Sequence, residues 1–261
     1  CRTGEGPDTV LSGLTITNGR HINIGGGMGI SGSPRVIHCR IINNRAIGRG
    51  AGVSTNSSPS FTHCTFADNA AQAYGGGLYI EGGNPALIHC TFLRNTAQRG
   101  GGIDLDVGSV TLTNCTFVQN STSTYGGGVH VLAWDSYPVN ITNCVFVGNH
   151  AGLFGGGIAS WDVPYPECYP HVYMVNCTFA GNGTGGGRSV ACNSSATYYQ
   201  LNNCILWEAD GIHCSGGATV GVYYSDVMGG WGPGPLIDAD PLFISNPGAG
   251  PDGQWGTADD D

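Results

Sequence analysis

The chain has 261 residues, of which 40% are hydrophobic and 10% are charged. Its nine basic residues are all arginine and stand against 18 acidic residues, which gives a net charge of −9 and no basic patch that would attract a phosphate backbone. The composition argues against nucleic acid as a partner, and no apolar run of about 18 residues is present that would span a membrane.

A repeat organises the chain from near its first residue. The motif Cys-x-Phe-x-x-Asn, followed by three glycines, begins at Cys64, Cys90, Cys115, Cys144 and Cys177, and weaker copies begin at Leu14, Cys39, Cys204 and Ser225. The early copies are 25 or 26 residues apart. Short stretches of alternating β-branched and aromatic residues separate the glycines from the asparagines, which predicts short strands. We therefore expect an all-β fold, a single-stranded right-handed parallel β-helix of about nine coils over residues 1–243.

Stacked coils place equivalent side chains in ladders. We expect the cysteines inside the coils as small apolar residues, beside a ladder of large apolar side chains. The glycine triplets supply positive φ angles or close backbone approach at one corner, and the asparagines tolerate a left-handed conformation and hydrogen-bond their stacked copies at another. The cysteine ladder is Cys39, Cys64, Cys90, Cys115, Cys144, Cys177 and Cys204, and the apolar ladder is Ile41, Phe66, Phe92, Phe117, Phe146, Phe179 and Leu206.

The repeats Asn114-Cys115-Thr116-Phe117 and Asn176-Cys177-Thr178-Phe179, with their glycine corners, resemble the right-handed β-helix repeat proteins of bacterial cell surfaces. That family has the pectate-lyase-like fold and is similar to polymorphic outer-membrane protein repeats. The resemblance covers roughly residues 9 to 243. It implies the fold and an extracellular or cell-surface location, but not one activity, because the family includes lyases, hydrolases and adhesins.

Histidine precedes the ladder cysteine in three successive coils, as His38, His63 and His89, and asparagine takes the same place in the next four. Three imidazoles beside three thiols have the chemistry to hold zinc or copper. Stacking arranges them in a row, however, whereas zinc prefers a tetrahedron. We expect these histidines to make the same corner hydrogen bonds as the asparagines.

A polysaccharide groove is expected on the outward side of the strands that follow the glycine corners. Aromatic rings beside acids and a histidine suit a saccharide, because sugar rings stack on aromatic faces and their hydroxyls bond to carboxylates. The alternative is that the aromatic residues only cover lengthened loops. The candidate ligand-binding residues are Tyr79, Asp104, Asp106 and His130, together with Trp134, Asp135, Trp161 and Asp162 from two inserts.

Two carboxylates on one face also meet a loose criterion for glycoside hydrolysis. If the protein is an enzyme, Asp104, Asp106 and Asp135 are the candidate catalytic residues. The chain has no Gly-His-Gly, no paired Asp-Asp in the repeat region and no lysine, so the signatures of a polysaccharide lyase or hydrolase are missing. The sequence favours a protein without catalytic residues.

Two further features lie toward the end of the chain. Cys192 and Cys214 fall at matching places on successive coils, which makes them a disulfide candidate in an oxidising compartment. Residues 244–261 form an acidic Gly/Pro/Asp-rich tail, in which Asp252, Asp259, Asp260 and Asp261 are possible calcium ligands. The alternative for the tail is a solvated linker.

The sequence as a whole predicts a secreted or cell-surface structural or adhesive protein that binds polysaccharide or other cell-surface components. Two alternatives stay open. One is a polysaccharide lyase or glycoside hydrolase of the same fold. The other is a subunit that stacks end to end into an extracellular fibre, since exposed strand edges template pairing.

Overall fold

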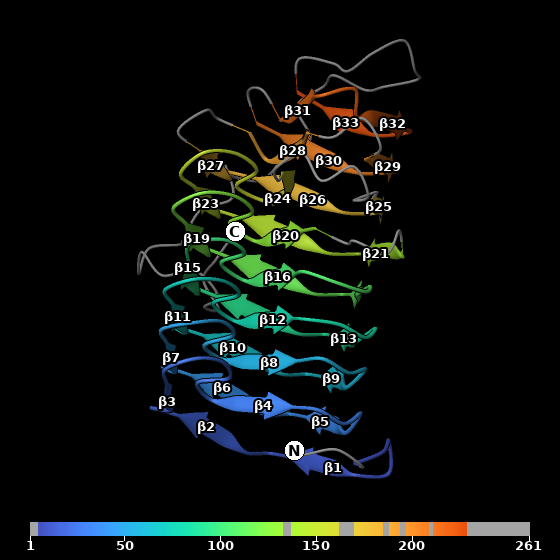
Figure 1. Ribbon diagram of the computed structural model, residues 1–261. Helices are drawn as coiled ribbons and strands as arrows, with labels where there is room; N and C mark the ends of the chain where they lie inside the picture. The colour runs from blue at the N-terminus through green and yellow to red at the C-terminus, as the bar shows by residue number, and fades with distance from the viewer. Residues whose placement is uncertain are drawn as a thin grey trace, which may run out of the picture.

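A computed structural model shows one continuous stack of short strands (Figure 1). It describes residues 5–132, 137–161, 170–184, 188–193, 197–208 and 211–228. Each strand pairs in parallel with the equivalent strand one coil away, and the four strands of a coil belong to four different sheets. This arrangement confirms the predicted right-handed parallel β-helix. The proposed tail from 244 to 261, with its four aspartates, lies outside the described residues.

The first and second sheets each have nine strands. The first contains β1 (Val10–Ser12), β5 (Arg35–Ile37), β9 (Ser60–Thr62), β13 (Ala86–Ile88), β17 (Thr111–Thr113), β21 (Pro138–Thr142), β25 (His171–Val175), β29 (Tyr198–Asn202) and β32 (Thr219–Tyr223). The second contains β2 (Thr15–Thr17), β6 (Arg40–Ile42), β10 (Thr65–Ala67), β14 (Thr91–Leu93), β18 (Thr116–Val118), β22 (Val145–Val147), β26 (Thr178–Ala180), β30 (Ile205–Trp207) and β33 (Asp226–Val227).

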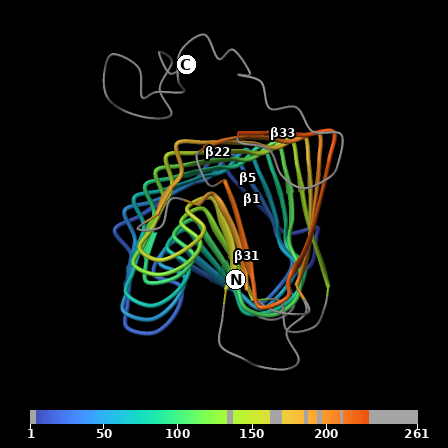
Figure 2. The same cartoon turned by 90° about the horizontal axis from the view of Figure 1, so that it is seen from above.

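The third and fourth sheets complete each coil. The third contains β3 (Arg20–His21), β7 (Arg45–Ala46), β11 (Ala70–Ala71), β15 (Thr96–Ala97), β19 (Ser121–Thr122), β23 (His150–Ala151) and β27 (Gly183–Thr184). The fourth contains β4 (Met28–Ile30), β8 (Val53–Thr55), β12 (Leu78–Ile80), β16 (Ile103–Leu105), β20 (Val129–Val131), β24 (Ile158–Trp161), β28 (Val190–Asn193) and β31 (Ile212–Ser215). Seen along the stack, successive coils follow similar paths and are displaced stepwise from one another (Figure 2).

The core confirms the predicted apolar ladder. The middle residue of each second-sheet strand points inward, and the rings of Phe66, Phe92, Phe117, Phe146 and Phe179 stack face to face with centroids 4.5 to 4.8 Å apart. All five side chains are fully buried. The stacking distance matches the strand spacing of about 4.8 Å, so each ring lies directly over its copy in the coil before.

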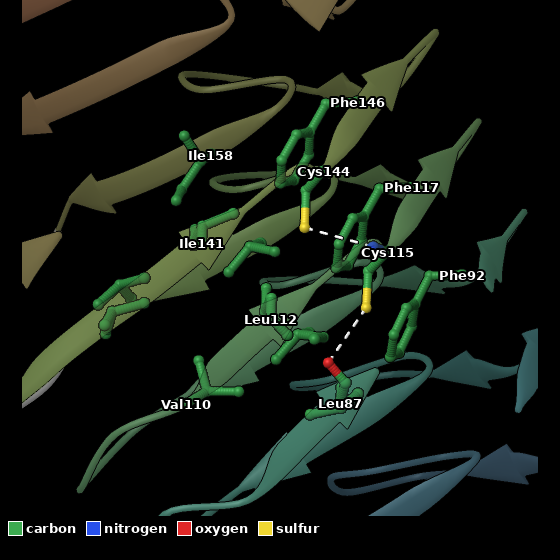
Figure 3. Close-up of a cluster of buried hydrophobic side chains, with 14 of the residues drawn as sticks. Leu87, Phe92, Val110, Leu112, Cys115, Phe117, Ile141, Cys144, Phe146 and Ile158 are labelled. Atoms are coloured by element: carbon green, nitrogen blue, oxygen red, sulfur yellow. Dashed lines mark hydrogen bonds between the residues drawn. The ribbon is translucent and has the colours of Figure 1, made fainter. Parts of the chain in front are cut away.

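The cysteine ladder is also inside and consists of unbonded thiols. Each Sγ lies near the carbonyl two residues earlier, and most also contact a carbonyl of the preceding coil: Cys115, for example, is 3.4 Å from Thr113 O and 3.5 Å from Leu87 O (Figure 3). A thiol is small enough for this tight corner and supplies a weak donor for carbonyls that strand pairing leaves partly unsatisfied. The ladder is therefore structural, as predicted.

The asparagine ladder differs from the prediction in one respect. Asn44, Asn69, Asn95, Asn120, Asn149 and Asn182 do bond to one another, with Nδ2 to Oδ1 distances of 2.9 to 3.0 Å. The prediction that these asparagines adopt the left-handed conformation is wrong, because positive φ occurs at the residue before them, as at Asn43 and Asp68. That residue turns the chain, which aims the following asparagine inward.

The glycine triplets meet both parts of the prediction. The first glycine has positive φ, as at Gly100 with φ of 62°. The second faces a close backbone approach, since a Cβ at Gly101 would lie 2.5 Å from the carbonyl oxygen of Gly127. Only glycine accommodates these two positions without displacing the next coil.

Glu208 ends the asparagine ladder. Its Oε1 accepts hydrogen bonds from the backbone N (2.9 Å) and Nδ2 (2.7 Å) of Asn182 and from Ser189 Oγ (3.0 Å). Glu208 Oε1 therefore accepts the two hydrogen bonds from Asn182 that an asparagine Oδ1 accepts elsewhere in the ladder. Burial raises the pKa of the Glu208 carboxyl, although the donors from Asn182 and Ser189 oppose that effect.

We expect Glu208→Gln to stabilise the protein at pH 7 and to change it little at pH 4. A carboxyl whose pKa is raised by folding contributes its full stability below its unfolded pKa and loses it as the pH rises through the folded pKa. Glutamine keeps the accepting oxygen without the charge. Thermal unfolding of both proteins from pH 4 to pH 8 measures the difference, and a difference that does not grow with pH would contradict the prediction.

Candidate functional site

The outer side of the fourth sheet contains the residues for which the sequence predicts a ligand groove. Tyr79, Asp104 and His130 are in-register neighbours on β12, β16 and β20. Their side chains alternate with inward residues such as Leu78 and Ile80, as expected. All three are nevertheless fully buried. The prediction that this column faces solvent is therefore wrong.

The side chains that cover this column come from the residue just before each glycine corner, which is Gly-Ala-Gly at residues 50–52 and Gly-Gly-Gly in the following coils. We call the residues Arg49, Tyr74, Arg99, Tyr125 and Phe154 the pre-glycine column. Bridges pair Tyr74 with Arg99 and Tyr125 with Phe154. Because the chain turns back after this column, its side chains pack against the outer side of the fourth sheet.

Arg99 is the central contact between the two columns. Its Nε lies 2.9 Å from Asp104 Oδ2, and Nη2 lies 3.3 Å from Asp104 Oδ1. The guanidinium also stacks on Tyr74, 4.2 Å from the ring centroid. Two bonds to one carboxylate and an aromatic neighbour hold Arg99 in one orientation.

Asp106 receives a second set of contacts at the edge of the cluster. Tyr79 donates its hydroxyl to Asp106 Oδ2 at 2.7 Å, and Arg49 Nη1 donates to the Tyr79 oxygen at 2.7 Å. The two arginines approach the Asp106 carboxylate to 3.8 and 4.0 Å. With 21% of its side chain exposed, Asp106 is the more accessible of the two acids.

The charges of this cluster are balanced within it. Burial alone would raise the pKa of Asp104, but Arg99 and His130 outweigh burial and hold that pKa below its usual value. Burial and Asp106 raise the pKa of Tyr79. Asp104 is therefore an ionised, enclosed carboxylate and Tyr79 a protonated phenol at neutral pH. Neither has the exposed, titrating character of a general acid or base at that pH.

Four of the candidate ligand-binding residues belong to the two inserts. Trp134 and Asp135 lie in the first insert and Asp162 in the second, and all three are outside the described residues. Trp161 ends β24, where its backbone pairs with Asn193. The structure brings together the other four candidates, Tyr79, Asp104, Asp106 and His130.

The histidine column forms a straight stack. The rings of His38, His63 and His89 are 4.8 to 4.9 Å apart and within 6° of parallel. All three have positive φ, as does Asn114 at the same corner in the next coil. Histidine thus takes the turn position that asparagine takes later in the stack. Among the described residues, no group of three or more His, Cys, Asp or Glu side chains is arranged to hold a metal ion.

Cys192 and Cys214 are in-register neighbours on β28 and β31, with unbonded sulfur atoms 2.7 Å apart. Cys214 is partly exposed, so a dissolved oxidant can reach this pair. The ladder cysteines differ, since they are buried and their sulfurs contact backbone carbonyls.

We expect oxidised glutathione to link Cys192 to Cys214 and to leave the cysteine ladder reduced. The two sulfur atoms already lie 2.7 Å apart and Cys214 is partly exposed, whereas all the ladder thiols are buried. Peptide mapping by mass spectrometry after oxidation of the folded protein identifies the pair, and Cys192→Ser serves as the control. A disulfide within the ladder, or none at all, would count against this prediction.

A cationic surface near the start of the stack was not expected from the composition. Five of the nine arginines lie between residues 20 and 49, whereas no acidic residue lies between Asp8 and Asp68. Arg20 and Arg45 are in-register neighbours on β3 and β7. The prediction that the chain has no basic patch is wrong because it used the net charge of the whole chain. A count of charges by coil would have found the patch.

A scan against protein families matches residues 4–163 to a right-handed β-helix region. No curated protein and no solved structure matches the chain. In the part of the chain that the structure describes, no helix is long and apolar enough to cross a membrane.

Proposed function

Because the chain belongs to the right-handed β-helix family, we propose that it is a non-catalytic scaffold, secreted or attached to the cell surface, that binds polysaccharide on its outer surface. The burial of Asp104 carries the proposal. Asp104, the first of the candidate catalytic residues, is fully buried and bound to Arg99. It therefore stabilises the stack and is inaccessible to a substrate.

The arrangement of the body supports a scaffold role. Its inward polar groups, above all the asparagine ladder, bond to the next coil. Such a stack is held by contacts between neighbours, which leaves the outer positions free to vary. We propose that ligand contacts come from these outer positions, including the inserts with Trp134, Asp135, Trp161 and Asp162.

The extracellular location and the calcium site are parts of the same proposal. The facing thiols of Cys192 and Cys214 suit an oxidising compartment. Asp252, Asp259, Asp260 and Asp261 supply hard oxygen donors, which calcium prefers. Calorimetric titration of the whole chain with calcium, beside a variant with all four aspartates changed to asparagine, tests the tail.

The test of the main proposal is a panel of neutral and acidic polysaccharides examined for retention and for turnover. In gels that contain each polysaccharide, we expect at least one to retard the protein. In solution, we expect no new reducing ends and no unsaturated products. Turnover would favour the lyase or hydrolase alternative, and failure of every polysaccharide to retard the protein would overturn the binding proposal. Sedimentation at several concentrations tests the fibre alternative.

A further inference from the structure

We propose that the pocket bounded by Arg20 and Arg45 on the third sheet binds a carboxylate-bearing sugar of an acidic polysaccharide. This inference rests on the proposed polysaccharide-binding function and gives it a ligand class and a site. The pocket has a volume of about 400 Å³ and opens between the first three strands of the sheet. That volume is within the usual range for small-ligand sites, which is about 300–1,000 Å³.

Arg20 and Arg45 repel each other electrostatically, and a bound anion would remove this repulsion. Arg20 pairs with Arg45 across β3 and β7, so two like charges stand on adjacent strands about 4.8 Å apart at their backbones. Like charges directly opposite one another destabilise a sheet. An anion bound between the two guanidinium groups turns this repulsion into two attractions.

Arg94 and Arg99 show how this chain holds an arginine that has a structural role. Arg94 makes two bonds to Asp68, and Arg99 makes two to Asp104. Within the described residues, neither Arg20 nor Arg45 has an ion-pair partner, and both side chains are exposed. Their charges are therefore available to a ligand.

The rest of the pocket suits a sugar ring. Ile22 and Ile47, which are 69% and 56% exposed, provide an apolar wall. Ala70 follows Arg45 in the next coil, and its small side chain leaves space beside the guanidinium. A pyranose has an apolar face of C–H groups that packs on such a wall.

Two neutral donors complete the lining. The Nδ1 of His21 accepts the backbone N–H groups of Asn23 (3.1 Å) and Ile24 (3.0 Å), so the proton of the neutral ring is on Nε2. The exposed amide of Gln72 lies on the same pocket. Guanidinium groups match a planar carboxylate with two parallel bonds, and the donors match hydroxyl groups. This combination favours a uronic acid over an inorganic anion.

The test is calorimetric titration of the whole chain with tetragalacturonic acid, with a neutral cello-oligosaccharide and with a linear polyphosphate. For the uronate tetramer, we expect the double variant Arg20→Ala/Arg45→Ala to bind at least tenfold more weakly than the unchanged protein. The matched control is Arg35→Ala/Arg40→Ala, which removes the same charge from the first and second sheets. We expect it to change the affinity less than threefold. Circular dichroism spectra of both variants check that they are folded.

Equal losses in the two double variants would overturn the site, because net charge alone would explain them. Tighter binding of polyphosphate than of the uronate would overturn the ligand class. Retention of the protein by neutral polysaccharides only would overturn this inference and leave the proposed function standing. If no polysaccharide retains the protein, both fail.

Discussion

We expect Asn120→Ala to lower the free energy of unfolding by about 4 kcal/mol, since a buried group left without its hydrogen-bond partner costs about 1 kcal/mol or more. Asn120 Oδ1 accepts from the backbone N and Nδ2 of Asn95, at 3.0 and 2.9 Å. Its Nδ2 donates to Phe92 O at 2.8 Å and to Asn149 Oδ1 at 2.9 Å. Alanine removes all four bonds from a fully buried site.

The measurement is denaturant unfolding followed by circular dichroism. Asn140→Ala is the matched control, because Asn140 is an exposed residue of β21 and the same substitution there should change stability by less than about 0.5 kcal/mol. If the two variants lose equal stability, the asparagine ladder does not hold the coils together in the way described.

We expect Asp104→Asn to lower the free energy of unfolding by about 3 kcal/mol at pH 7, since breaking a buried ion pair leaves an uncompensated charge. The charge left behind is that of Arg99, whose side chain is 12% exposed. Asp106 lies 3.8 Å from Arg99 and offsets part of the loss.

The matched control is Asp68→Asn, which breaks an exposed pair of the same kind with Arg94. An exposed pair contributes about 0–1 kcal/mol to stability. A larger loss in Asp104→Asn than in Asp68→Asn therefore measures the effect of burying the ion pair. The pH dependence gives a second test. Folding lowers the pKa of Asp104, so its stabilisation is present above the unfolded pKa and is lost as the pH falls through the folded pKa. The difference between the unchanged protein and Asp104→Asn should therefore shrink in acid, and a constant difference would contradict this account.

The sequence predicts the stacked coils well because equivalent residues pair in register in every coil. A fixed spacing between Cys115 and its copies requires Phe117 to stack on Phe92 and Phe146, since parallel strands keep equivalent residues in register. No knowledge of distant contacts is needed for this step. The same reasoning identifies the pairing of Cys192 with Cys214.

Two features depend on information that the repeat does not contain. Alternation correctly turns Tyr79 and Asp104 away from the core, but it does not show that Arg49 and Arg99 lie over them. The path of the chain through the glycine triplet decides that, because it returns the preceding residue to the same face. Similarly, a φ preference for asparagine does not show which of two successive residues, Asn43 or Asn44, makes the turn.

The Arg20–Arg45 surface was missed for a different reason. Net charge averages over the chain, whereas a solenoid separates its coils along one axis, so the acidic residues from Asp68 onward lie on later coils than Arg20 and Arg45. Screening limits such interactions to about 8–10 Å at moderate salt. Charge in a stacked protein is therefore best counted coil by coil.

The most direct test of the central claim compares the folded Asp104→Asn variant with the unchanged protein on an acidic polysaccharide, with retention and product formation measured together. We predict that both proteins are retarded equally in a gel containing the polysaccharide and that neither releases products. Turnover by the unchanged protein that disappears in Asp104→Asn would contradict the account, because Asp104 would then be a catalytic residue instead of part of the scaffold.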